Sequence, residues 1–240
     1  MFVLAIDTAT PAVSAGVIEL SADGEEARAV ATRVTLDARR HVEAVIPQVK
    51  ECLAASGLTP ADLAAVVVGA GPGPFTGLRV GMATAAAYAD ASNLPLYSVC
   101  SLDAIAYATQ TTEPGLPDLL VATDARRKEV YWAIYGPDGA RLTEPSVDKP
   151  ARLRELLDAG QVRASVASGE GAAQYADELG LEVRGEGFPS CEGLVHGARE
   201  RIVSSAATEA PRPLYLRRPD ATPAAQIRSE IGVVGSASYP

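Results

Sequence analysis

The sequence predicts an α/β protein built from two similar lobes. Short apolar runs, many of them rich in β-branched residues, alternate with amphipathic helical patterns along most of the 240 residues. Each half of the chain also opens in the same way, with a strand that ends in an aspartate, a tight turn and a returning strand. The two aspartates, Asp7 and Asp124, stand about half the chain apart. This alternation and this repeat are the grounds for the fold prediction.

The first half of the chain predicts the order β-β-β-α-β-α-β. Its first three strands are joined by short turns, which favours an antiparallel start. The first helix carries apolar residues at the 3.6-residue period and ends at Ser56-Gly57. In chain order the predicted elements are strands 2–7, 13–20 and 27–35, helix 38–55, strand 63–68, helix 76–91 and strand 94–99.

The second half repeats the opening of the first after a boundary loop. A helix at 102–109 is followed by residues 110–117, which are rich in Thr, Pro and Gly. The predicted elements beyond it are strands 118–123 and 129–135, helix 150–158, strand 163–167, helices 171–179 and 191–205, and an extended segment at 211–218. We therefore predict an N-terminal lobe at 1–109, a C-terminal lobe at 110–218 and a mobile tail at 219–240, where few large apolar residues occur.

Two lobes that each open with a strand–Asp–turn–strand hairpin are how the fold of the actin-like ATPases and sugar kinases, the ASKHA fold, is built. Backbone N–H groups in such a turn can bind phosphate oxygens, and the aspartate can hold a hydrated Mg²⁺. The sequence therefore leaves open a site for ATP or ADP with Mg²⁺, formed by Asp7, Thr8, Thr10, Asp124, Gly169 and Gly171. The alternative for the first turn is an ordinary hairpin in which the Asp and Thr side chains cap their own backbone.

A glycine- and proline-rich loop at residues 69–77 does not match a known phosphate-binding spacing. Leu78-Arg79 follows its last glycine where a Walker loop has Lys followed by Ser or Thr, and the third glycine is misplaced for GxGxxG. We interpret this loop as a strand-to-helix turn that aims the helix behind it.

Composition and charge restrict the function classes. The formal net charge is −9 and the sequence pI is near 4.8, which argues against a protein that grips nucleic acid by itself. Three cysteines in no CxxC spacing favour a reducing cytoplasm. No apolar run approaches the ~20 residues needed to cross a bilayer, and the start MFVLAIDTAT is typical of a first strand, not of a signal peptide. We therefore expect a cytoplasmic protein.

Signals for catalysis are scarce. The chain has two histidines, His41 and His196. A helical metal site needs a second ligand four residues on, where Val45 follows His41. The sequence contains no HExxH and no GxSxG motif. We predict no metal site and no catalytic residue in this chain.

Two helices favour a role in protein–protein contact. Gly77, Gly81 and Ala85 recur at every fourth position and form a strip without side-chain bulk on helix 76–91. Such a strip lets another helix approach closely. The same helix is small or apolar nearly all round, and a helix of that kind must be covered on both sides. We therefore predict an interface through helices 38–55 and 76–91.

With these features assembled, the sequence resembles the bacterial TsaB family, also called YeaZ. The glycine-rich motif is the most specific point of resemblance, and Pro74 within it stands where the family usually has serine, which stiffens the loop. Together the motifs cover nearly the whole chain. In order they are LAIDTAT at 4–10, Arg39-Arg40-His41, GPGPFTGLRVG at 71–81, DARRKEVYWAIY at 124–135 and PLYLRRPDAT at 213–222.

The resemblance implies the ASKHA fold and a partner. TsaB-like proteins pair with the paralogous TsaD subunit through the two helices named above, which form a helix bundle. TsaD holds the metal through two histidines on its first helix and performs the transfer, and TsaE supplies an ATPase. This sequence keeps one histidine, His41. The implied interface residues are Arg40, His41, Val45, Val49, Gly77, Val80, Gly81, Thr84, Ala85 and Tyr88.

The resemblance thus implies a non-catalytic scaffold subunit. It would be required for N6-threonylcarbamoyladenosine (t6A) at position 37 of ANN-decoding tRNAs, with the tRNA contacted indirectly through other subunits. An exposed apolar helix face also predicts a self-dimer when the protein is isolated. The alternative, from a different class, is a self-sufficient ATPase or kinase of the same fold that uses Asp7 and Asp124 around Mg-ATP.

Overall fold

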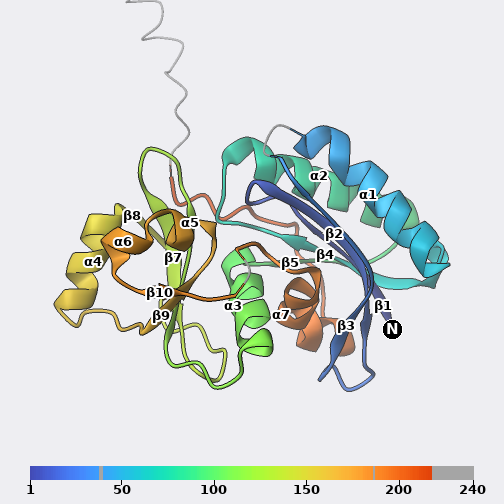
Figure 1. Ribbon diagram of the computed structural model, residues 1–240. Helices are drawn as coiled ribbons and strands as arrows, with labels where there is room; N and C mark the ends of the chain where they lie inside the picture. The colour runs from blue at the N-terminus through green and yellow to red at the C-terminus, as the bar shows by residue number, and fades with distance from the viewer. Residues whose placement is uncertain (38–39, 186, 218–240) are drawn as a thin grey trace, which may run out of the picture.

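Two five-stranded sheets, one in each lobe, form the framework of the molecule (Figure 1). The computed structural model describes residues 1–37, 40–185 and 187–217, so the predicted tail at 219–240 lies outside the described residues. The first sheet has the order β3-β2-β1-β4-β5. Its strands are β1 (Phe2–Asp7), β2 (Ala12–Leu20), β3 (Ala27–Leu36), β4 (Leu63–Gly69) and β5 (Leu96–Val99).

The second sheet repeats the topology of the first, in the order β10-β9-β6-β7-β8. In each sheet the first strand of the lobe pairs antiparallel with the next strand and parallel with a later one. The predicted architecture of two similar lobes is therefore confirmed, with Asp7 and Asp124 each at the end of a first strand. The second set of strands is β6 (Leu119–Asp124), β7 (Val130–Tyr135), β8 (Ser146–Asp148), β9 (Val166–Ser168) and β10 (Glu182–Val183).

Helices cover both faces of the first sheet (Figure 1). On one face lie α1 (His41–Ser56) and α2 (Phe75–Ser92), and on the other lies α7 (Cys191–Val203). Because successive strand residues point to opposite faces, Leu4 and Ile6 of β1 pack in the core under α1 and α2. Val3 and Ala5 of the same strand pack in the core under α7.

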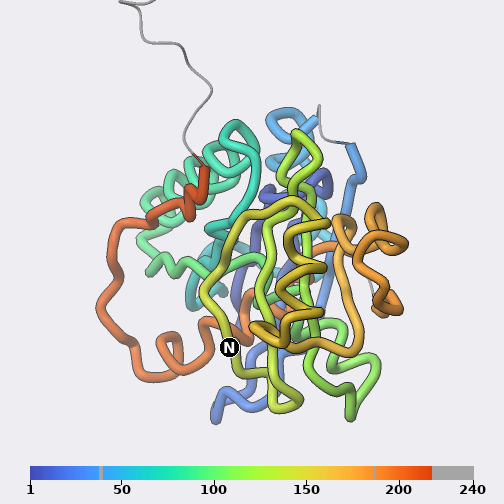
Figure 2. The backbone as a smooth tube through the Cα atoms, turned by 90° about the vertical axis from the view of Figure 1, so that its left-hand side faces the viewer, coloured from blue at the N-terminus to red at the C-terminus, as the bar shows by residue number. Residues whose placement is uncertain are grey.

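The second lobe is built in the same layered way and faces the viewer in Figure 2. One face of its sheet packs against α3 (Ser101–Thr112), which lies between the lobes. The opposite face packs against α4 (Pro150–Asp158), α5 (Glu170–Gln174) and α6 (Ala176–Leu179). A short 3-10 helix, η1 (Pro60–Asp62), precedes β4. No helix in the described ranges is both long and apolar enough to cross a membrane.

Several predicted bounds differ from the structure. The helix predicted at 171–179 is divided into α5 and α6, because Tyr175 leaves the helical region with φ −119°. Helix α3 runs on to Thr112, so the predicted boundary loop begins later than expected. The predicted helix 38–55 is observed from His41, and residues 38–39 are outside the described ranges. The short elements β8, β10 and η1 carry no apolar period long enough to reveal them.

The end of the described chain returns to the first lobe. Although α7 falls within the predicted C-terminal lobe, it packs against β1, β2, β4 and β5; the division at residue 110 stays a prediction. Residues 206–217, which we call the strap, then pass along β5. The hydroxyl of Tyr97 donates a hydrogen bond to the carbonyl oxygen of Ala206 at 3.1 Å. The N–H of Leu214 donates a hydrogen bond to the carbonyl oxygen of Ala70 at 2.8 Å. The predicted extended segment is described up to Arg217 and contains no helix or strand.

Candidate functional site

The first Asp-containing turn is a structural junction. Asp7 is fully buried, and its Oδ1 accepts a hydrogen bond from the N–H of Ala9 at 2.7 Å. Its Oδ2 accepts from the hydroxyl of Ser101 at 2.6 Å, and the same hydroxyl oxygen accepts from the N–H of Gly71 at 3.2 Å. Burial raises the pKa of Asp7 to about 6, although these hydrogen bonds lower it. The carboxylate therefore ties β1 to α3 and to the glycine-rich loop.

The glycine-rich loop covers this turn. Thr8 and Thr10 are each 2% exposed. A Cβ placed on Gly73 would overlap the carbonyl oxygen of Ala9, so only glycine allows the loop to lie this close. His41 Nε2 lies 2.9 Å from the carbonyl oxygen of Thr10. The turn has the capped hairpin geometry of the alternative interpretation, and its residues from Asp7 to Thr10 are buried.

The small-residue strip of α2 faces the same turn. A Cβ on Gly81 would overlap the hydroxyl of Thr8, and one on Gly77 would lie 2.5 Å from the Thr8 carbonyl oxygen. The Thr8 hydroxyl donates a hydrogen bond to the carbonyl oxygen of Gly77 at 2.7 Å. Ala85 is fully buried. These three small residues therefore pack against the chain's own fold, which corrects the prediction that the strip receives a partner helix.

Some of the interface residues predicted on helix α1 also face the core of the protein. Val45 is 1% exposed and belongs, with Val49, to the core under the helix. These two side chains cannot contact a partner without unpacking that core, so their assignment to the interface is corrected as well. The exposed large hydrophobic residues of α1 are Val42, at 67%, and Ile46, at 42%. Arg40, at the start of the helix, is exposed.

Helix α2 presents a second set of small and apolar residues outward. Val80, Thr84 and Tyr88 recur at every fourth position and are partly exposed, while Ala83 and Ala87 are exposed. The Tyr88 hydroxyl is buried without a hydrogen-bond partner in the described part of the chain, and burial raises its pKa. We call the outward residues of both helices the helix-pair face: Val42, Ile46, Val80, Ala83, Thr84, Ala87 and Tyr88.

The second Asp-containing turn is open. Oδ1 of Asp124 accepts a hydrogen bond from the N–H of Arg126 at 2.9 Å, and the two side chains form an ion pair at 3.6 Å. Gly169 and Gly171 pack against the backbone of β6, because a Cβ on either would overlap it. Gly169 also has φ +101°, which favours glycine. These two glycines bring the start of α5 close to the end of β6.

Glu170, between the two glycines, is a partly buried carboxyl that sequence reasoning missed. Its Oε1 accepts a hydrogen bond from the N–H of Asp124 at 3.4 Å, and its Oε2 is buried without a partner among the described residues. Burial raises the pKa of Glu170 to about 8, and repulsion from Asp124 and Asp7 adds to this. Its only sequence signal is its place at the start of a helix. No group of three His, Cys, Asp or Glu residues in the described part of the chain is arranged to hold a metal.

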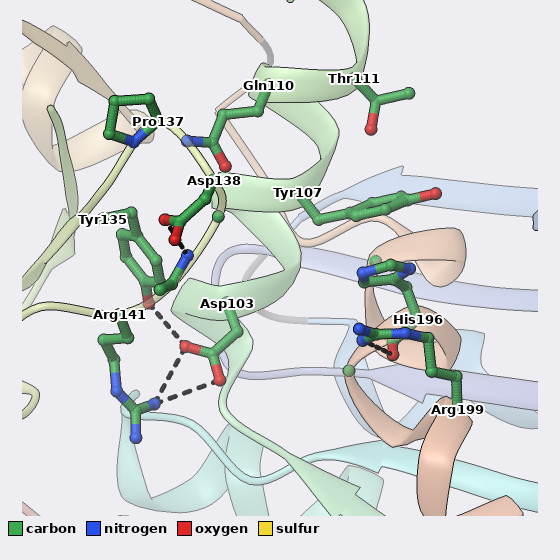
Figure 3. Close-up of a pocket in the computed structure, with 14 residues that line it drawn as sticks. Asp103, Tyr107, Gln110, Thr111, Tyr135, Pro137, Asp138, Arg141, His196 and Arg199 are labelled. Atoms are coloured by element: carbon green, nitrogen blue, oxygen red, sulfur yellow. Dashed lines mark hydrogen bonds and ion pairs between the residues drawn. The ribbon is translucent and has the colours of Figure 1, made fainter. Parts of the chain in front are cut away.

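A polar pocket of about 570 Å³ lies between α3, α7 and the connection after β7 (Figure 3). In it Asp103 accepts hydrogen bonds from the Tyr135 hydroxyl at 2.7 Å and from Arg141 at 2.9 and 3.1 Å. The ring of His196 stacks on Tyr107 with centroids 4.2 Å apart, and burial lowers the pKa of His196 to about 4. Asp103 and Arg141 pair with each other, and the imidazole of His196 is neutral at physiological pH. No sequence motif marks these residues, which come from separate elements.

The repeated sheets and their two hairpin openings define a protein of the two-lobed, actin-like class. A solved YeaZ structure from Pseudomonas aeruginosa aligns with a TM-score of 0.72 and 25% identity, covering 90% of this chain and 99% of that chain. Component A of (R)-2-hydroxyglutaryl-CoA dehydratase from Acidaminococcus fermentans aligns with a TM-score of 0.53 at 13% identity, which shows the fold alone.

Sequence comparison then identifies the family. Residues 34–179 match the family model described as TsaD, tRNA N6-adenosine threonylcarbamoyltransferase. The chain is 33% identical to the tRNA threonylcarbamoyladenosine biosynthesis protein TsaB of Escherichia coli, over 90% of this chain and 95% of that protein. It is 50% identical to an uncharacterized protein of Mycobacterium tuberculosis, over 93% and 95%, and it spans 56% of the length of a 48% identical Mycobacterium leprae relative. The protein belongs to the TsaB (YeaZ) family.

Proposed function

We propose that this protein is a non-catalytic scaffold subunit that pairs with a TsaD-like transferase. It would be required for t6A formation at position 37 of ANN-decoding tRNAs. The proposal is supported by membership of a family whose E. coli relative is named for this biosynthesis, and by the match of residues 34–179 to the TsaD family model. A TsaE-like ATPase in the larger complex and a cytoplasmic location belong to the same proposal.

The observation that carries the pairing is the apolar exposure of the helix-pair face. Val42 and Ile46 stand one helical turn apart and are 67% and 42% exposed. Covering each of them with a partner contributes about 1–2 kcal/mol at most, at the usual free energy per buried apolar area. The neighbouring small residues Ala83 and Ala87 of α2 let a second helix approach closely. The same face would form the self-dimer when no partner is present.

The alternative of a self-sufficient ATPase or kinase has less support. It requires Asp7 and the first turn to reach Mg-ATP, whereas both oxygens of Asp7 accept hydrogen bonds from within the chain. Asp124 is the more accessible of the two aspartates. Release of phosphate from Mg-ATP by the isolated protein, lost in both Asp7→Asn and Asp124→Asn, would favour this alternative.

The test of the pairing is a charge placed on the helix-pair face. The double variant Val42→Asp, Ile46→Asp should stay folded, because both side chains are exposed, and should lose co-purification with the TsaD-like partner. Desolvating two carboxylates in an interface costs several kcal/mol, so we expect at least about a hundredfold weaker association. The t6A content of tRNA should fall in parallel when this variant is the sole copy in the cell.

A matched control uses exposed apolar residues elsewhere on the molecule. Val34 and Leu142 are 57% and 56% exposed and lie outside α1 and α2. The double variant Val34→Asp, Leu142→Asp should keep both partner binding and t6A. Equal binding by the helix variant and the control would overturn the proposed docking face.

A further inference from the structure

A second pocket of about 570 Å³ lies beside the outer strand of the first sheet. It is bounded by β2 and β3, by the second half of α3 and by residues 188–192, which lead into α7. Figure 1 shows α3 and α7 on the opposite side of this sheet from α1 and α2, so the pocket is separate from the helix-pair face. We call it the β3 pocket and define it by Ser14, Ala29, Val34, Tyr107, Ala108 and Phe188.

The strand register places Ser14 between a buried and an exposed neighbour. Ser14 of β2 stands opposite Asp7 of β1 on one side and Val34 of β3 on the other. Directly opposite residues project to the same face of a sheet. Asp7 is fully buried, whereas Val34 is 57% exposed. The pocket therefore leads from solvent at Val34 inward to Ser14.

The Ser14 hydroxyl is a buried polar group without a partner. Ser14 is 1% exposed, and its Oγ makes no hydrogen bond with any of the residues that the structure describes. A buried hydroxyl left unpaired is unfavourable, and most such groups in proteins are paired. The carboxylate of Asp7 accepts instead from the N–H of Ala9 and the hydroxyl of Ser101. The Ser14 hydroxyl can therefore pair with a bound molecule.

Much of the remaining wall is apolar or aromatic. Val34 of β3, Ala108 of α3 and the ring of Phe188 line it. The ring of Tyr107, which also lines it, is held in place by stacking on His196 with centroids 4.2 Å apart. Pockets of this size with apolar and aromatic walls and a few polar groups are typical of sites for small organic molecules.

The charges of the lining favour neither an anion nor a cation. Arg28 and Glu192 contribute one charge of each sign, and Arg28 pairs with Glu19 of β2. The other polar residues of the lining carry uncharged hydroxyl groups. Burying a charge without a partner costs more than burying a neutral group that forms a hydrogen bond. An uncharged ligand therefore suits this wall.

We propose that the β3 pocket binds a small, uncharged aromatic molecule that donates a hydrogen bond to Ser14. The ring of the ligand packs among Val34, Ala108 and Phe188, where aromatic and aliphatic groups supply the contact area. A single N–H or O–H group on the ring reaches Ser14 Oγ and satisfies it. This site requires neither the helix-pair face nor a partner subunit, so it goes beyond the proposed function.

The test compares two ring molecules that differ in one group. Indole carries an N–H where indene, of nearly the same size, carries a CH₂ group. We expect both to bind the isolated full chain at millimolar concentration. Indole should bind about threefold to tenfold more tightly, the factor that one net hydrogen bond contributes. Binding is followed by NMR of the backbone amides, whose shifts should lie along β3 and the second half of α3.

The variant Ser14→Ala should bind indole and indene equally, by weakening indole alone. Because it removes an unpaired hydroxyl, its thermal midpoint should not fall. Equal affinities of the two compounds for the unmodified protein would overturn the proposal, and so would an unchanged preference for indole in Ser14→Ala.

A second pair of variants tests the location. Ala108→Phe fills the pocket and should abolish binding of both compounds. Ala151→Phe adds the same ring at an exposed position of α4 outside the pocket, and it should bind like the unmodified protein. Shifts confined to residues outside the pocket, or no saturable binding of either compound, would show that the β3 pocket is not the site.

Discussion

The two turns that open the lobes occupy equivalent places in sheets of the same topology, yet they serve different roles. The first, after Asp7, is buried under the glycine-rich loop and the start of α2. The second, after Asp124, is open and carries exposed arginine and lysine side chains. The difference lies in what packs on each turn. A shared topology determines where a turn lies, and the segment above it determines whether a ligand can reach it.

Truncating each of the two aspartates should give the largest difference in stability between the two turns. Asp7→Ala leaves the Ala9 N–H and the Ser101 hydroxyl buried without their acceptor, at about 1–3 kcal/mol for each group. We expect a loss of about 3 kcal/mol in the free energy of unfolding by urea. Asp124→Ala removes a partly exposed carboxylate and should cost less than about 1 kcal/mol. Similar losses in the two variants would contradict the assignment of different roles.

A double-mutant cycle tests the close contact between α2 and the first turn. Gly81→Ala places a methyl group against the Thr8 hydroxyl and should cost about 2 kcal/mol by overpacking. Thr8→Ala removes that hydroxyl and its hydrogen bond to Gly77. In the Thr8→Ala background, the destabilisation caused by Gly81→Ala should therefore be smaller by about 1 kcal/mol. Ala87→Leu, on the exposed side of the same helix, should leave stability nearly unchanged. Additive effects of Thr8→Ala and Gly81→Ala would refute direct contact between the two sites.

The pH dependence of stability tests the second turn through Glu170. Its pKa is raised to about 8 in the folded protein, so the folded state binds a proton that the unfolded state releases. Its contribution to stability is present in full below its ordinary pKa of 4.5 and is lost as pH rises through about 8. Glu170→Gln should abolish this loss and be more stable than the unmodified protein at pH 8, by on the order of 2 kcal/mol.

The control for this measurement is the same comparison at about pH 3, well below the pKa of either state, where the unmodified side chain is protonated in both states. There the two proteins should be equally stable within error. A stability difference independent of pH would show that Glu170 acts through packing and not through its ionisation.

Some of the predicted interface could be read from sequence and some could not. The 3.6-residue period of α1 marks Val45 and Val49 as apolar positions, but a period cannot say whether they face the chain's own sheet or a partner. Burial decides this, and it leaves Val42 and Ile46 as the exposed large hydrophobic residues. The small residues of α2 posed the same question, and contact with Thr8 answers it.

From the sequence alone followed the order of most elements, the repeated opening of the two lobes and the resemblance to the TsaB family, because these depend on local periodicity and on motifs within short segments. Only the tertiary structure decided which side of α2 is free, that the first turn is buried under the glycine-rich loop, that Glu170 is partly buried beside Asp124, and that Tyr215 stacks on Phe75. Each of these is a contact between residues far apart in the chain, and no local pattern encodes it.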